Sequence, residues 1–124
     1  MLLIVLATAR PEALSSFAAA LSSDPEVHLQ QVASGTEALE AGRTLAPHLM
    51  VIDYLPDTES LSLVRKLLTV NAMVNTAVVS PLADEEFHEA SEGLGILGRL
   101  PSEPGISEAA DLLQKLRQVL GRTG

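Results

Sequence analysis

The chain alternates short apolar runs with segments whose apolar residues recur at the spacing of a helix. Residues 2–6, 48–52, 76–80 and 96–100 are rich in aliphatic side chains, as expected for strands covered on both faces of a parallel sheet. Residues 27–32 mix polar and apolar side chains and predict another strand, near an edge of the sheet. The pattern therefore predicts five strands.

Five further segments predict helices. Four of them carry apolar residues three or four positions apart, which is typical of helices with one buried face, whereas the short acidic segment 85–92 has little apolar content. The five segments cover residues 12–22, residues 36–45, a stretch that begins near residue 57 or 58, residues 85–92 and residues 106–120. Asp57 or Thr58 is expected to cap the third helix. Its inward-facing stripe is predicted to consist of Leu61, Val64, Leu67 and Leu68.

Residues that favour helix starts and stops occur at the ends of the predicted helices. Pro11 suits the first turn of the first helix, where its missing N–H costs nothing. Ser34 is expected to cap the second helix in a capping box with Glu37. Gly121 is a suitable stop for the last helix.

Strands that alternate with helices at short spacing predict an α/β fold: one doubly wound parallel sheet of five strands with helices on both faces. Right-handed crossovers then place the carboxyl ends of all the strands along one edge. With 124 residues the chain is long enough for one core but not two. We expect one domain over residues 1–121, followed by a tail or the start of a linker over residues 122–124.

The composition narrows the possible functions. Sixteen acidic residues against 8 basic ones give a net charge of −8, which disfavours direct binding of nucleic acid. The absence of cysteine excludes disulfides, thiolate catalysis and cysteine-based zinc sites. The apolar start of the chain is too short to span a bilayer, so we expect a buried strand, no membrane attachment and a cytoplasmic location.

Asp53 is the first candidate for chemistry, because it ends the apolar run 48–52 and precedes a turn with Pro56. Ligands and reactions gather at the carboxyl ends of the strands in open α/β sheets. Asp53 is therefore either a functional carboxylate or one that accepts backbone N–H groups in its own turn. His28, His48 and His88 lack the paired spacing of ligands, and no metal site is predicted from them.

Three stretches resemble the receiver domains of response regulators, and the resemblance extends over essentially the full length. Residues 32–39 are similar to the family's second strand-to-helix junction, and residues 46–53 to the segment that carries the phosphoacceptor aspartate. Residues 92–101 resemble the fifth-strand segment, which in the family ends in Lys-Pro. The resemblance implies a flavodoxin-like fold of strand–helix units in a signalling module that is not an enzyme.

In that family a histidine kinase passes a phosphoryl group to the central aspartate. Magnesium, held by this aspartate and by an acidic pair after the first strand, neutralises charge on the transferred oxygens. A lysine after the fifth strand binds the phosphoryl group, and a hydroxyl after the fourth strand then turns inward. By this resemblance Asp53 matches the acceptor and Ser80 the switch hydroxyl, although Ser80 equally fits a cap of the turn at Pro81.

The other family positions are changed. The acidic pair is replaced by Ala7 with either Leu6 or Thr8, depending on the placement of one gap. The lysine position is Leu100, and the position of the family's switch aromatic is Leu97. One carboxylate is a poor magnesium site, so we expect no cofactor and a Mg²⁺ site that is lost or weak.

Each lost charge removes several kcal/mol of transition-state stabilisation, roughly orders of magnitude in rate. Arg10, Arg99 or Lys66 compensates only if the fold brings one of them to the pocket. We therefore expect an atypical receiver domain of two-component (phosphorelay) signal transduction that acts as a phosphate-independent or weakly phosphorylatable protein–protein interaction module. Its expected partner is a histidine kinase, an output domain or a second copy, bound through the fourth helix, fifth strand and fifth helix.

Two alternatives remain open at this point. The first is a functional receiver that a histidine kinase phosphorylates on Asp53. The second is a small-molecule sensor, because removing two acids and a lysine leaves a more apolar crevice at the strand exits.

Overall fold

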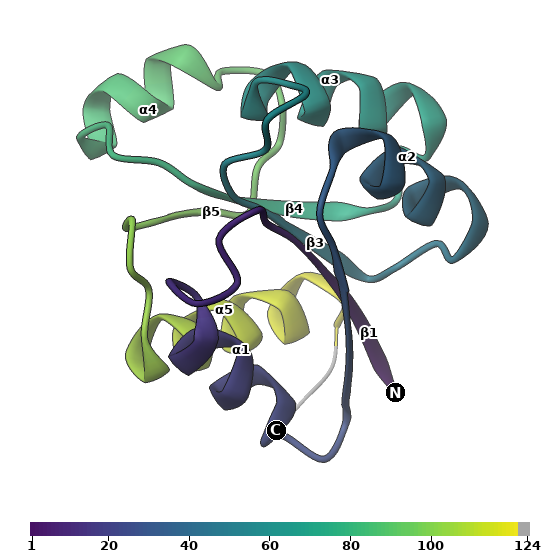
Figure 1. Cartoon of the computed structure of the whole chain (residues 1–124), viewed down its shortest axis with the longest axis vertical. Coiled ribbons are helices and arrows are strands. Elements are labelled where there is room, and N and C mark those ends of the chain that lie inside the picture. The colour runs from purple at the N-terminus through teal and green to yellow at the C-terminus, as the bar shows by residue number, and fades with distance from the viewer. Residues whose placement is uncertain (122–124) are drawn as a thin grey trace.

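The computed structural model describes residues 1–121 as alternating strands and helices (Figure 1). The expected tail or linker at residues 122–124 lies outside the described residues. The elements are β1 (Leu2–Ala7), α1 (Ser15–Ser22), β2 (Val27–Val32), α2 (Gly35–Thr44), β3 (Leu49–Ile52), α3 (Ser60–Val70), β4 (Asn75–Val79), α4 (Asp84–Ala90), β5 (Gly98–Leu100) and α5 (Ile106–Val119).

The strands form one five-stranded sheet in the order β2-β1-β3-β4-β5, and all neighbouring strands are parallel. Helices α1 and α5 cover one face of the sheet, and α2, α3 and α4 cover the other (Figure 1). This is the flavodoxin-like order of a doubly wound fold. The predicted fold class is confirmed, and the ends of all five strands point to the same edge.

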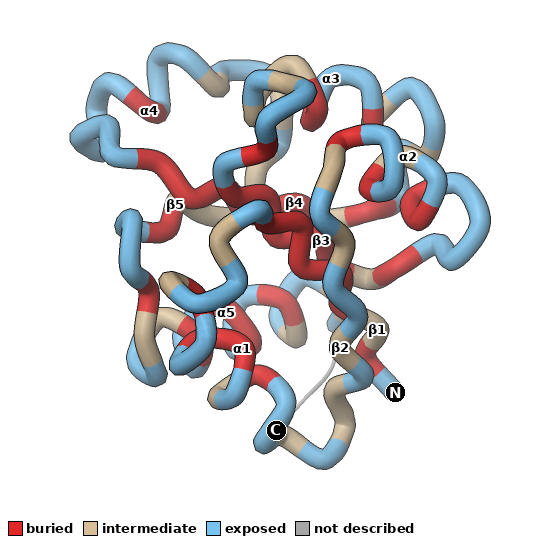
Figure 2. The backbone as a smooth tube through the Cα atoms, in the orientation of Figure 1, coloured by how far each residue is buried: buried red, intermediate tan, exposed pale blue. Residues whose placement is uncertain are grey.

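Two apolar layers hold the sheet between its helices, and buried backbone follows the central strands in Figure 2. The layer under α1 and α5 contains residues of β1, β3 and β4 together with Phe17 and Leu116. The opposite layer contains Met50, Leu63 and Phe87. Aliphatic side chains make up almost all of both layers, as expected from an aromatic content of 2%.

Helices α2 and α3 approach each other closely at Gly42. A Cβ atom at this position would clash with Leu67 Cδ1, so a larger residue would require the Leu67 side chain to shift. The N-terminus of α3 lies near the end of β4, where Ser60 and Leu61 line a hollow together with Val78 and Ser80.

Two predictions about helix α1 and strand β5 need correction. Helix α1 begins at Ser15 rather than at residue 12, because residues 10–15 make tighter turn bonds, such as Ala13 N–H to Arg10 O at 3.1 Å. Strand β5 begins at Gly98 rather than at residue 96, although Leu97 N–H still donates to Thr76 O. Helix α3 begins at Ser60, two or three residues later than predicted, and the other ends agree with the predictions to within about two residues.

The capping of α2 follows the predicted capping box with one difference. The Ser34 hydroxyl accepts the N–H of Glu37 at 3.1 Å. The Glu37 carboxylate accepts the N–H of Ala33 at 3.0 Å, one residue before the cap. Both contacts fix the turn that leads from β2 into the helix.

The prediction that Asp57 or Thr58 caps α3 is wrong. Glu59 is the cap, and its carboxylate accepts N–H groups of the first turn of α3. Asp57 turns instead to the start of α2 and accepts the Gly35 N–H at 2.8 Å. This hydrogen bond is the main reason why the pKa of Asp57 is lowered. A spacing signal cannot tell which of two nearby helix ends a carboxylate reaches.

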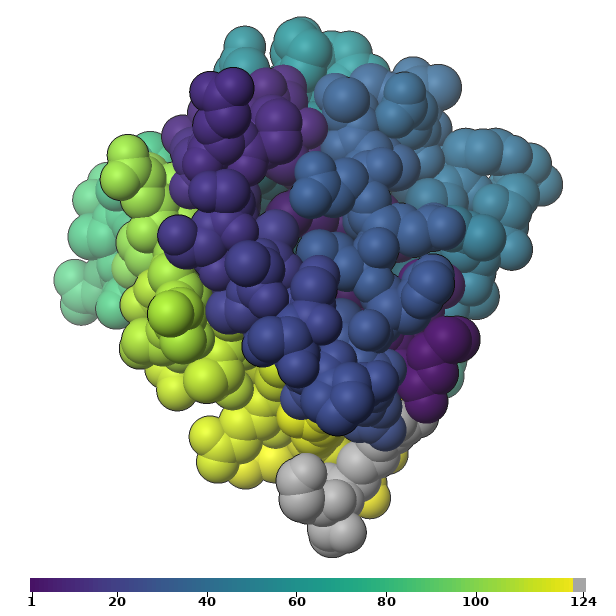
Figure 3. All heavy atoms as spheres, turned by 60° about the horizontal axis from the view of Figure 1, so that its bottom comes forward, coloured from purple at the N-terminus to yellow at the C-terminus, as the bar shows by residue number. Residues whose placement is uncertain are grey.

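Helix α1 lies between α5 and β2 on one surface of the molecule (Figure 3). Arg117 of α5 binds Asp24 and Glu26, which lie between α1 and β2, at 2.8 Å and 3.0 Å. These ion pairs lower the pKa of Asp24 and raise that of Arg117. The contacts tie the last helix to the N-terminal half of the chain. Within residues 1–121 no helix is both long and apolar enough to cross a membrane.

Replacing Asp24 by Asn tests the ion pair between Asp24 and Arg117. A lowered pKa means that the Asp24 carboxylate stabilises the fold above its unfolded pKa of about 3.9, and that this contribution disappears as the pH falls through the lower folded value. We expect Asp24→Asn to lower the free energy of unfolding by ~1 kcal/mol near pH 7 and by much less near pH 2. Urea denaturation at both pH values measures the difference.

Glu40→Gln is the matched control, because Glu40 and Arg43 form an exposed ion pair within α2. It should cost less than ~0.5 kcal/mol at either pH. An Asp24→Asn effect of equal size at both pH values would contradict the role assigned to the carboxylate.

Candidate functional site

Asp53 lies directly after β3, at the edge where the strands end, and only 1% of its side chain is exposed. Its backbone N–H donates to Ala7 O at 2.9 Å and extends the pairing of β1 with β3 by one residue. The carboxylate is thereby held at the exits of the two central strands. A carboxylate buried to this degree requires a cation or several hydrogen-bond donors.

Arg10 supplies the cation. Its Nε donates to Asp53 Oδ2 at 3.0 Å, and its Nη2 donates to Asp53 Oδ1 at 2.6 Å. Both carboxylate oxygens are therefore bound by one guanidinium in the bidentate geometry that makes arginine–carboxylate pairs strong. The hydrogen bond with Asp53 is also the main reason why the pKa of Arg10 is raised.

Thr8 completes the arrangement from the end of β1. Its hydroxyl donates to Asp53 Oδ2 at 2.6 Å and accepts the backbone N–H of Arg10 at 2.8 Å. Thr8 is itself only 3% exposed. One hydroxyl therefore orients the carboxylate and also fixes the chain that carries the arginine.

The arginine also reaches across the edge of the sheet to the loop after β5. Arg10 Nη2 donates to the carbonyl oxygen of Ser102 at 3.1 Å. The Arg10 side chain remains 37% exposed, so solvent reaches the outer side of the guanidinium. We call Thr8, Arg10 and Asp53 together the arginine lock, since they join the exits of β1, β3 and β5.

The arginine lock does not fit a magnesium ion. Magnesium requires oxygen ligands, usually one or two carboxylates with waters and phosphate oxygens. At Asp53 both oxygens already bind a guanidinium, whose positive charge repels a metal ion. No cluster of three or more acidic or histidine side chains suited to a metal occurs among residues 1–121.

Ser80 follows β4 on the same edge and is 8% exposed. Its hydroxyl accepts the N–H of Leu82 at 3.2 Å, which is the turn-capping contact that the sequence left open. Leu100, at the family's lysine position, packs into the apolar layer under α1 and α5. Leu97, at the family's aromatic position, packs against the same layer just before β5.

Of the three cations considered from the sequence, only Arg10 reaches the acceptor position. Arg99 binds Asp84 at 2.8 Å and the carbonyl oxygen of Ser80 at 2.9 Å. Lys66 is exposed on α3. The structure therefore brings Asp53 together with Thr8 and Arg10, while Ser80 makes its hydrogen bond elsewhere along the edge.

Solved structures with the same fold are numerous. The receiver domain of Thermotoga maritima CheB superimposes with a TM-score of 0.80 at 18% identity, covering 100% of this chain and 99% of that one. The receiver domain of Francisella response regulator 1452 gives 0.80 at 16% identity, covering 96% and 99%. A CheY-like receiver domain protein of Methanospirillum hungatei JF-1 gives 0.79 at 20% identity, covering 98% and 94%.

The chain has the fold of a response-regulator receiver domain. No family model matches the sequence, and no curated protein does. The receiver-like fold places Asp53 after the third strand, as the sequence resemblance implied.

The sequence identified Arg10 only as one of three cations, with Arg99 and Lys66, that the fold could bring to the candidate site. The signal that favours it is its position two residues beyond Thr8, directly after a buried strand that pairs with the strand of Asp53. A buried acid needs a cation near its own edge, and the exit of β1 is the nearest segment that carries one. Choosing Arg10 still required knowing the path of the loop.

Replacing Arg10 by Met tests the arginine lock, because it removes the cation and keeps most of the side-chain volume. The Asp53 carboxylate is then buried without its partner, which costs 3–5 kcal/mol in a fully buried pair. Because Arg10 is partly exposed, we expect the free energy of unfolding to fall by ~2 kcal/mol. Chemical denaturation measures this loss.

Adding Asp53→Asn to Arg10→Met should recover part of the loss, since the uncompensated charge is then gone. Arg43→Met is the matched control, because Arg43 is exposed on α2, and it should cost less than ~0.5 kcal/mol. If Arg10→Met has the same cost with and without Asp53→Asn, the two side chains are not coupled and the lock is refuted.

Proposed function

We propose that this protein is a receiver-like signalling module that binds a protein partner without control by phosphorylation of Asp53. The observation that carries the proposal is the bidentate bond of Arg10 to both Asp53 oxygens. In a phosphorylatable receiver one of these oxygens must attack phosphorus while a metal ion shares the other. Here the guanidinium and the Thr8 hydroxyl already fill those directions.

The surroundings of the lock also lack the groups that stabilise a transferred phosphoryl group. The last residue of β5 is Leu100, whose side chain is in the core, and Thr8 offers a hydroxyl where a metal-binding acid would be needed. Losing such charges removes several kcal/mol of transition-state stabilisation, which is roughly orders of magnitude in rate. The arginine lock substitutes for these groups as a structural charge pair.

The partner is proposed to bind the face formed by α4, β5 and α5. Between residues 84 and 115 the only lysine and arginine residues are Arg99, which pairs with Asp84, and Lys115, whereas half of the 16 acidic residues of the chain lie there. Two copies of such a surface repel each other, whereas a partner that presents basic residues is attracted and steered to it. The eight acids are Asp84, Glu85, Glu86, Glu89, Glu92, Glu103, Glu108 and Asp111.

Incubation with acetyl phosphate and Mg²⁺ tests the phosphate-independent function. We expect no phosphoryl group on Asp53 by intact-protein mass spectrometry, because both of its oxygens are bound by the guanidinium of Arg10. We also expect no change of stability when Mg²⁺ is added in the millimolar range, since a ligand stabilises only the state that it binds.

The double variant Thr8→Asp with Arg10→Ala is the positive control, because it places a second carboxylate beside Asp53 and removes the guanidinium. It should gain Mg²⁺-dependent stability, which two adjacent carboxylates support. Stable phosphorylation of the unchanged protein at Asp53 would refute phosphate independence and favour the functional-acceptor alternative.

Site-specific photo-crosslinking in the cells that make this protein tests the partner face. A photoreactive side chain at Glu86 on α4 should form an adduct with a different protein, whereas one at Ser16 on α1 should not. An adduct with twice the mass of the chain would indicate a second copy and contradict the proposed basic partner.

The adduct should also depend on charge. Its yield should fall when Glu85 and Glu89 are both replaced by Lys, because the attraction to a basic surface is lost. It should stay unchanged when Glu12 and Glu40, which are exposed elsewhere, are replaced in the same way. Equal loss in both double variants would show that the acidic face has no specific role.

A further inference from the structure

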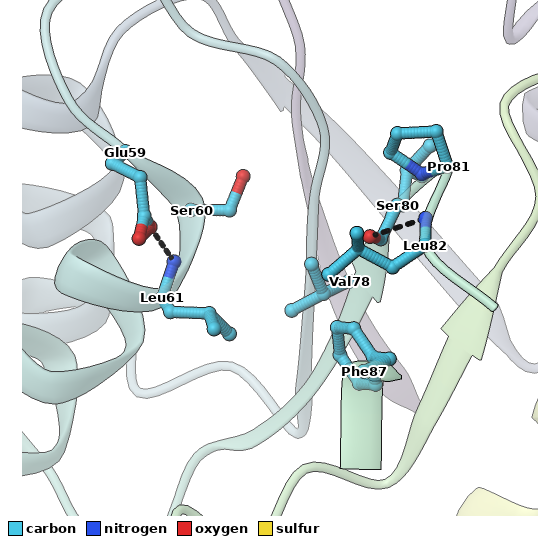
Figure 4. Close-up of a pocket in the computed structure, with 9 residues that line it drawn as sticks. Glu59, Ser60, Leu61, Val78, Ser80, Pro81, Leu82 and Phe87 are labelled. Carbon is cyan, nitrogen blue, oxygen red and sulfur yellow. Dashed lines mark hydrogen bonds between the residues drawn. The ribbon is translucent and has the colours of Figure 1, made fainter. Parts of the chain in front are cut away.

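A crevice with an apolar floor opens beside the arginine lock, between the start of α3 and the end of β4. This first hollow has a volume of about 210 Å³. Its floor contains Val78 and Phe87, which are 1% and 7% exposed, and Leu61 faces them from α3 (Figure 4). Leu82, 38% exposed, forms part of the outer rim.

A second hollow of about 360 Å³ adjoins the first, and Arg10 and Asp53 of the arginine lock line its wall. Ser60, Val79 and Pro81 line both hollows, so the two lie side by side, and we call them together the crevice. The larger hollow alone lies within the range of about 300–1,000 Å³ that is common for small-molecule sites. Its position at the carboxyl ends of the strands is where doubly wound sheets bind ligands.

Several polar groups along this crevice have no partner among the described residues. The hydroxyls of Tyr54, Ser60 and Ser102 and the Nη1 group of Arg10 make no hydrogen bond within residues 1–121. In Figure 4 the Ser60 hydroxyl points away from α3 into the space opposite the turn at Pro81. By contrast, the carboxylate of Asp53 is bound by the lock, and that of Glu59 accepts N–H groups of α3. The guanidinium of Arg10 can only donate, so a ligand at this end of the crevice must bring an acceptor, whereas the hydroxyls can serve either role.

The charge of the crevice excludes strongly anionic ligands. The charge of Arg10 is balanced by Asp53 at 2.6 Å, and Glu59 adds a negative charge to the wall. The whole chain carries a net charge of −8, which repels anions further. We propose that the crevice binds an uncharged small molecule with a compact apolar group on the Val78, Phe87 and Leu61 floor and a carbonyl oxygen facing Ser60 and Arg10.

Acetanilide is a suitable probe, because it combines one aromatic ring with one amide carbonyl and has no charge. Titrating it into the ¹⁵N-labelled protein should shift backbone amide signals of Leu61, Val79, Leu82 and their neighbours in one saturable process. Phenylacetate, with the same ring but a negative charge, should bind at least about tenfold more weakly, which corresponds to about 1.4 kcal/mol.

Ser60→Tyr should fill the junction of the two hollows and weaken acetanilide binding at least about tenfold. Leu82→Glu, on the exposed rim, is a second variant that leaves the core intact and should also weaken binding. Ser16→Tyr adds the same ring on exposed α1 and should leave binding unchanged.

Three results would overturn the proposal. The first is the absence of saturable shifts up to the solubility limit of acetanilide. The second is tighter binding of phenylacetate, which would assign the crevice to anions. The third is unchanged affinity in both Ser60→Tyr and Leu82→Glu, which would place the probe elsewhere. None of these results depends on whether Asp53 is phosphorylated, so this inference and the proposed signalling function fail separately.

Discussion

The buried carboxylate of Asp53 sets the main constraint on this structure, because a charge removed from water must be compensated. Compensation comes from one guanidinium that binds both carboxylate oxygens, and from the Thr8 hydroxyl that orients them. Arg10 must therefore stay at the edge of the sheet. The delayed start of α1 is consistent with this position, since turns at residues 10–15 keep Arg10 near the exit of β1.

The same pair explains how this fold holds a buried acid at the end of its third strand. Leu100 and Leu97 belong to the apolar layer under α1 and α5, while Ser80 holds the turn after β4. Arg10 supplies the cation for Asp53 and also contacts Ser102 after β5. The charges of Asp53 and Arg10 therefore compensate each other where the strands end. The adjoining crevice is lined by polar groups without partners among the described residues.

Much of the fold could be predicted because it depends on local patterns. The aliphatic runs predicted the strands, and Ser34 with Glu37 predicted the start of α2. The error at Asp57 has a physical cause: Asp57, Thr58 and Glu59 lie close together in the sequence, and the distance to two helix ends decides which one each side chain caps. Local propensity contains no information about that distance.

The sequence by itself determined the α/β class and the position of Asp53 at a strand exit. These follow from periodicity and from the rule that parallel strands end at one edge. Only the tertiary structure decided which cation meets Asp53. Arg10, Arg99 and Lys66 were equivalent by spacing, but the loop after β1 carries Arg10 to the carboxylate, whereas Arg99 turns to Asp84. A contact between residues 43 positions apart is set by the path of the chain, and no local pattern encodes it.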